Sequence, residues 1–202
     1  MKIVRNAGRT FVLLLTLVVL IVLSSCNQHV TPKPRGYFRI NFPEHEYDSL
    51  VSDNPYTFNV PVYVQVNQDF SPNTEAYWMN LDYPEYKGRI HLSYKKIEDN
   101  LNIVLEDSRK LAYKHSVKAD AIGERLFLAP EKKVYGILYE IKGDAASSVQ
   151  FYLTDSIQNF VRGSLYFNVV PNKDSLAPVV DFVTEDIIHL METFEWKSLP
   201  KF

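Results

Sequence analysis

Residues 134–169, VYGILYEIKGDAASSVQFYLTDSIQNFVRGSLYFNV, decide the fold. They contain three runs rich in β-branched and aromatic residues, Val134–Ile141, Ser148–Thr154 and Phe160–Val169. Short linkers of small or polar residues, Lys142–Ser147 and Asp155–Asn159, separate these runs. Runs of this composition bounded by turn residues are typical of strands. The stretch therefore predicts an antiparallel meander of three strands.

Upstream of the meander the sequence predicts three more strands. Apolar and polar residues alternate from Tyr56 to Val66, which is typical of a half-buried strand, and Pro61 would place that strand at a sheet edge. Similar alternation in Tyr77–Tyr83 and Arg89–Tyr94 flanks Pro84–Gly88, which contains both turn-forming residue types. We expect these two runs to form a hairpin.

Two segments have helical periodicity instead. Apolar and small residues recur every three or four positions from Ile97 to His115, so we expect an amphipathic helix with His115 on its core side. A second helix is predicted to start near Asp174 or Ser175 and to tolerate Pro178 in its first turn. Its expected buried residues are Val179, Phe182, Val183, Ile187, Leu190, Met191 and Phe194.

The order of these elements predicts the fold class. Runs of strands separated by two long helices favour an α+β domain over a parallel βαβ sheet. We expect one domain, residues 37–202, with a twisted antiparallel sheet of about six strands and a helix packed on each face. In architecture this order resembles the small PsbP and Mog1-like domains.

The amino terminus has the pattern of a lipoprotein signal peptide. Basic residues without acidic ones precede an apolar run from Phe11 to Leu23. That run is shorter than the roughly 20 residues a membrane-spanning helix needs. Leu23-Ser24-Ser25-Cys26 matches a lipobox, so residues 1–25 are predicted to be removed and Cys26 to carry the lipid anchor. The alternative is a plain secretory signal followed by an ordinary thiol.

The rest of the amino-terminal composition agrees with export. Cys26 is the only cysteine, so no disulfide can form within the chain. Residues 26–36 contain Pro32 and Pro34 and are predicted to be an extended tether. Removing residues 1–25 removes three basic residues and no acidic ones, which moves the formal net charge from −2 to −5. Nucleic acid is therefore an unexpected partner. No aspartate follows Cys26, and we expect a periplasm-facing protein of the outer membrane.

No sequence motif specifies an enzyme. G-x-S-x-G, H-E-x-x-H, C-x-x-C and glycine-rich phosphate loops are all missing. A metal site at Glu44, His45 and Glu46 is disfavoured because successive residues of an extended segment point in opposite directions. We therefore expect no catalytic residues, no metal and no cofactor.

Three segments are hard to explain by packing alone. Residues 34–43 alternate arginines with aromatic residues, which are types enriched at binding hot spots. Residues 142–148 contain no bulky apolar group, which permits another backbone or a ligand to come close, although an ordinary hairpin loop would look the same. Residues 111–122 are the third segment. The candidate binding surface combines Arg35, Tyr37 and Arg39 with Lys142, Asp144 and Arg162.

Together these segments, with residues 134–139, 148–155 and 172–178, closely resemble the gliding motility lipoprotein GldD family over nearly all of the chain after Cys26. The resemblance implies a protein of Bacteroidota required for gliding over surfaces and for the linked type IX secretion machinery. The leading hypothesis is a non-enzymatic accessory protein, held in the membrane by lipid and docked to other machinery proteins. The alternative is a binding module for a small ligand, glycan or peptidoglycan fragment in a cleft near Lys142–Ser148, and an enzyme is the third option.

Overall fold

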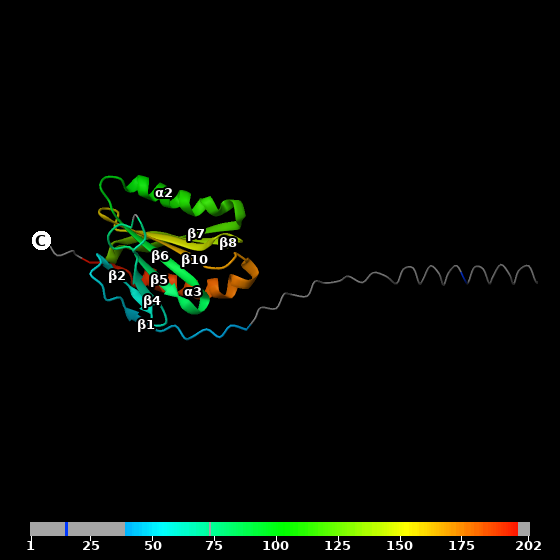
Figure 1. Cartoon of the computed structure of the whole chain (residues 1–202). Helices are drawn as coiled ribbons and strands as arrows, with labels where there is room; N and C mark the ends of the chain where they lie inside the picture. The colour runs from blue at the N-terminus through cyan, green and yellow to red at the C-terminus, as the bar shows by residue number, and fades with distance from the viewer. Residues whose placement is uncertain (1–14, 16–38, 73, 198–202) are drawn as a thin grey trace, which may run out of the picture. The chain divides into compact units, whose positions relative to one another are not determined.

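A computed structural model describes residue 15 and residues 39–72 and 74–197 of the chain (Figure 1). Cys26, Arg35 and Tyr37 lie outside these described residues. The strands are β1 (Tyr47–Ser49), β2 (Tyr56–Thr57), β3 (Asn59–Pro61), β4 (Gln65–Gln68), β5 (Met79–Tyr83), β6 (Gly88–Lys96), β7 (Ala119–Ala129), β8 (Val134–Gly143), β9 (Ser147–Thr154), β10 (Asn159–Phe167) and β11 (Glu195–Trp196). The α-helices are α2 (Leu101–Tyr113) and α3 (Lys173–Thr193), and short 3₁₀ helices are η1 (Pro84–Tyr86), η2 (Lys114–Lys118) and η3 (Pro130–Lys132).

Seven strands form one antiparallel sheet in the order β4-β5-β6-β10-β9-β8-β7. The predicted meander is confirmed, because β8, β9 and β10 are consecutive neighbours in this order. The predicted hairpin is confirmed as well, since β5 and β6 pair from Met79 with Leu92 to Tyr83 with Gly88. The α+β fold class is therefore correct, with one strand more than the six expected.

One strand expectation was wrong, and one strand was not predicted. Residues 56–66 do not form a single strand, because a turn in which Val64 N–H donates to Pro61 O breaks the segment. Its pieces pair separately: β2 with β11, β3 with β1, and β4 with β5. The sequence also gave no prediction for β7, an eleven-residue strand at the sheet edge. Most of its side chains are exposed, so it lacks the alternation that marks a half-buried strand.

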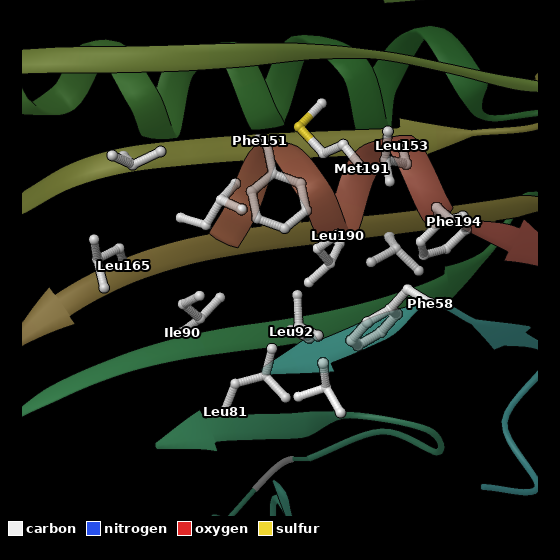
Figure 2. Packing of buried hydrophobic residues seen from close by; sticks show 14 of the residues in the cluster. Phe58, Leu81, Ile90, Leu92, Phe151, Leu153, Leu165, Leu190, Met191 and Phe194 are labelled. Atoms are coloured by element: carbon white, nitrogen blue, oxygen red, sulfur yellow. The ribbon is translucent and has the colours of Figure 1, made fainter. Parts of the chain in front are cut away.

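Helix α3 covers one face of the sheet and completes the main core (Figure 2). All seven residues predicted to be buried on this helix are buried, and Phe194 follows its last turn. The expected position of Pro178 was wrong, since α3 begins at Lys173 and places Pro178 beyond the first turn. In the centre of the core, a Cβ on Gly163 would lie 2.2 Å from two ring atoms of Phe151. The glycine thus makes room for an aromatic ring on the neighbouring strand.

Helix α2 lies on the opposite face (Figure 1). It buries Ser108 and Ala112, two members of the predicted stripe. The predicted bounds were too wide at the start, because Ile97 is buried beyond β6 and its N–H donates to Gln158 O instead of entering a helix. His115 falls in η2, and its side chain lies outside the described part of the structure, so its core-facing position remains a prediction.

Candidate functional site

A cleft of about 500 Å³ lies between the β8–β9 turn and the first half of α3. This volume is within the usual range for a site that holds a small molecule. Ile141, Ala145, Val149, Leu176, Ala177 and Val180 supply its apolar lining. The cleft is at the turn Lys142–Ser148, where the sequence predicted that a ligand or another backbone could come close.

Gly143 sets the path of the turn beside the cleft. It adopts φ +117°, a conformation that residues with a side chain rarely take. A Cβ at this position would lie 2.7 Å from both Asp120 N and Lys118 O. Glycine is therefore required here because the start of β7 approaches the end of β8 so closely. The close neighbour that the small-residue turn predicted is, at this position, another backbone.

The turn is also fastened to the start of α3. Asp144 Oδ1 accepts a hydrogen bond of 2.8 Å from Lys173 N, the first residue of the helix. Asn172 caps the helix, with its Oδ1 accepting from Ser175 N at 3.1 Å. Lys173 Nζ in turn forms an ion pair with Asp120 at the start of β7. Asp144 thus links the β8–β9 turn to the first residue of α3, and this link holds one wall of the cleft.

The lining of the cleft carries more acidic than basic side chains. The acidic ones are Asp120, Glu140, Asp174 and Asp181, and the basic ones are Lys142 and Lys173. Glu140 is paired with Arg125 at 3.1 Å, and Lys173 with Asp120, so part of this charge is neutralised within the protein. With four acidic and two basic side chains, the lining as a whole favours a neutral or cationic ligand over a polyanion.

The structure brings together only part of the predicted binding surface. Lys142 lines the cleft and Asp144 borders it. Arg39 is exposed in the segment that precedes β1, and no contact joins it to the cleft in the described structure. Arg35 and Tyr37 lie outside the described residues.

The expectation that Arg162 joins Lys142 in one patch was wrong. Val161 and Leu165 of β10 belong to the core under α3, and alternation along the strand places Arg162 on the other face of the sheet. Lys142, in contrast, lines a cleft with residues of α3. A helix was expected on each face of the sheet, but the sequence did not show that Arg162 and Lys142 lie on opposite faces.

Arg162 belongs to a polar layer on the α2 side of the sheet. Its Nη2 donates to Gln150 Oε1 at 2.5 Å, and burial lowers the pKa of its guanidinium. Gln150 and Ser164 are buried on the same face. Arg162 has no ion pair with an acidic side chain in the part of the chain that the structure describes. The partner of its guanidinium among the described residues is thus the neutral side chain of Gln150.

Sequence reasoning missed a second polar cluster, centred on the buried carboxylate of Asp186 in α3. Asp186 accepts hydrogen bonds from Tyr47 at 2.9 Å, Tyr63 at 2.9 Å and Tyr83 at 3.2 Å. His45 Nδ1 lies 2.8 Å from the same carboxylate, and His45 Nε2 lies 3.1 Å from Glu185. The cluster joins the segment before β1 to the helix, and no spacing in the sequence links residues so far apart.

Burial and the negative charge nearby change the acidity of these tyrosines. Desolvation is the main reason that the pKa values of Tyr47, Tyr63 and Tyr83 are raised, and the adjacent Asp186 raises them further. The tyrosines therefore stay protonated and serve as donors. Among the described residues no group of three or more potential ligands could hold a metal ion, and His45 is engaged by Asp186 and Glu185 rather than by Glu44 or Glu46.

Comparison with known proteins decides the family. The model of the gliding motility lipoprotein GldD family matches residues 27–196. The chain belongs to this family. The GldD family assignment confirms the resemblance read from the sequence, and it makes the chain a lipid-anchored envelope protein of gliding motility. Comparison with curated proteins finds no match.

Among solved structures, the solution structure of cyanobacterial PsbP (CyanoP) from Synechocystis sp. PCC 6803 is similar to this chain. The TM-score is 0.46 at 9% sequence identity, over 79% of this chain and 97% of that chain. None of the described helices has the length and apolar character needed to span a membrane.

Proposed function

We propose that this GldD-family protein is a non-enzymatic accessory component of the gliding motility and type IX secretion machinery. Lipid on Cys26 holds it in the outer membrane, facing the periplasm, and the folded domain docks to other proteins of the machinery. The family match over residues 27–196 is the observation that carries this proposal.

The Asp186 cluster supports a non-enzymatic role. A carboxylate next to a histidine and three tyrosines has the residue types of an acid–base site. Here, however, Asp186 is buried and already accepts hydrogen bonds from the three tyrosines, while His45 lies between Asp186 and Glu185. Groups that satisfy one another in this way stabilise the attachment of the segment before β1.

Complementation of a deletion strain tests the proposal. Cells without the protein are expected to lose both spreading on agar and export of a type IX cargo reporter, and the wild-type gene should restore both. A strain that loses spreading but exports the reporter normally would limit the role to motility. Normal spreading and export in the deletion strain would refute the proposed function.

A second candidate function is binding of a small ligand, glycan or peptidoglycan fragment in the cleft beside α3. Its volume of about 500 Å³ and mixed polar and apolar lining are the observations that favour it. Replacing Val180 with Trp should fill the cleft, whereas Val170→Trp adds the same group at an exposed position that does not line it.

Calorimetric titration with purified muropeptides separates the two variants. A cleft that binds these ligands predicts at least about a tenfold loss of affinity in Val180→Trp and none in Val170→Trp. Absence of binding to the wild-type chain, or equal binding to both variants, would exclude muropeptides as ligands of this cleft.

A further inference from the structure

Strand β7 is a long open edge of the main sheet. It pairs with β8 on one side and is the last strand in the sheet order, so the backbone groups on its outer side have no strand partner in the described structure. The opposite edge, β4, has only four residues. Unpaired N–H and C=O groups along an edge can pair with an additional strand. Only an extended backbone satisfies such a row of donors and acceptors.

Both faces of the sheet next to this edge offer apolar contacts. Leu126 and Leu128 pair with Ile137 and Tyr135 of β8, which alternate with core residues under α3, so the two leucines lie on the α2 side. They are 66% and 58% exposed. On the α3 side a pocket of about 90 Å³ is lined by Phe127, Ile188 and Met191, among others. Side chains of an added strand point alternately to the two faces. One set would therefore contact the two leucines, and the other would reach the pocket.

The edge has few of the features that usually prevent strand addition. Natural edges are often protected by lysines, prolines, bulges or short length. From Ile122 to Ala129 the pairing with β8 is regular, because the irregularity in β7 is confined to Ala119–Ala121. The two charged residues of this stretch are engaged within the protein: Glu124 accepts from Tyr113 at 2.7 Å, and Arg125 pairs with Glu140.

A second copy of the chain fits this edge poorly. Antiparallel pairing of two β7 strands centred on Glu124 or Arg125 would place like charges directly opposite each other, which is unfavourable. Registers centred on Leu126 or Phe127 do not place like charges opposite each other. They pair no more than residues 123–129 of each copy, because Pro130 follows and has no N–H to donate. Stable interfaces involve roughly 20–30 residues on each side. The area of such a contact is thus too small for a stable dimer.

We propose that β7 is a docking site for an extended segment of another envelope protein, which adds a strand to the sheet and carries aliphatic side chains at alternate positions. Main-chain hydrogen bonds supply the affinity in this mode, and the side-chain contacts supply the specificity. The proposal rests on the docking role proposed above, and it names the surface and the chemical character of the partner.

Peptide binding to the purified full chain in detergent tests the proposal without reference to gliding. The probe is a fluorescent, blocked heptapeptide, Lys-Val-Thr-Val-Thr-Val-Lys, and the control peptide has proline in place of the central valine. We expect the first peptide to bind and to slow hydrogen exchange of β7 amides, and the second to do neither. The double variant Leu126→Lys/Leu128→Lys should lose affinity at least about tenfold. Ile157→Lys, a matched change at a 67% exposed site in the β9–β10 turn, should not.

Three results would overturn the proposal: no binding to the wild-type chain, equal binding to the double variant, or protection of amides elsewhere than β7. A concentration-dependent dimer that the double variant abolishes would overturn it too, in favour of a second copy. Because the assay contains only the chain and a peptide, failure here leaves the proposed role in motility intact. Loss of that role would instead appear in the deletion strain.

Discussion

Asp186 is the residue whose removal should be most damaging outside the apolar core. Asp186→Ala removes the carboxylate that the hydroxyls of Tyr47, Tyr63 and Tyr83 and one nitrogen of His45 share as a partner. Tyr83 is 2% exposed, so water cannot replace the lost partner. An unsatisfied buried donor costs about 1–3 kcal/mol, and breaking up a buried charged cluster costs about 3–5 kcal/mol. We expect the free energy of unfolding to fall by about 3–5 kcal/mol, a large part of the 5–15 kcal/mol typical of a domain.

Glu185→Ala provides the matched control, because it removes the neighbouring carboxylate from the same helix. Glu185 is 69% exposed and contacts only His45 Nε2 in this cluster, so its loss should cost under about 1 kcal/mol. Urea unfolding of the full chain, followed by tryptophan fluorescence, gives both values. If the two variants lose the same stability, the buried carboxylate does not organise the cluster and the reasoning is wrong.

Three further outcomes are expected. Cys26→Ala should abolish acyl labelling and membrane retention, since no other cysteine can take the lipid, and labelled membrane-bound protein in this variant would contradict the assignment. The raised pKa values of Tyr47, Tyr63 and Tyr83 mean that the folded chain keeps protons that the unfolded chain releases near pH 10. The contribution of these tyrosines to stability should therefore be fully present below about pH 10 and be lost above it, seen as a lower urea midpoint at pH 11 than at pH 8. Arg162→Glu should lower the melting temperature more than Arg162→Met, because only the first puts a carboxylate against Gln150 Oε1, and equal melting of the two would show that Arg162 is solvated.

Local patterns in the sequence predicted the elements whose two faces differ. Composition and bounding turn residues identified β8, β9 and β10, and helical periodicity identified α3 and its buried residues. Strand β7 lies at the sheet edge, where most of its side chains are exposed. Apolar and charged residues therefore do not alternate along it, and the sequence lacks the period of two that marks a half-buried strand. Residues 56–66 show the opposite error, because regular alternation continues through a turn closed by the Val64–Pro61 hydrogen bond, and the strands on its two sides pair with different partners.

The candidate sites could be predicted only in part, because each is formed by residues that are far apart in the sequence. The small residues of Lys142–Ser148 correctly indicated a close approach at the turn, but the other wall of the cleft comes from α3. Arg162 and Lys142 were expected in one patch, and only the three-dimensional arrangement shows that they lie on opposite faces of the sheet. Asp186 reads as an ordinary polar position on a helix, and its partners precede it by more than a hundred residues.

The attachment of residues 42–47 to α3 has a mechanical consequence for a chain anchored by its amino terminus. Tension between the membrane and the domain enters the fold through this segment, which is held by stacking of Phe42 on Phe182, by stacking of Tyr47 on His189 and by the link from His45 to Asp186. Only the three-residue strand β1 continues it, paired with β3 outside the seven-stranded sheet. A sustained pull would therefore peel these contacts one after another and lengthen the tether before the main sheet bears any load.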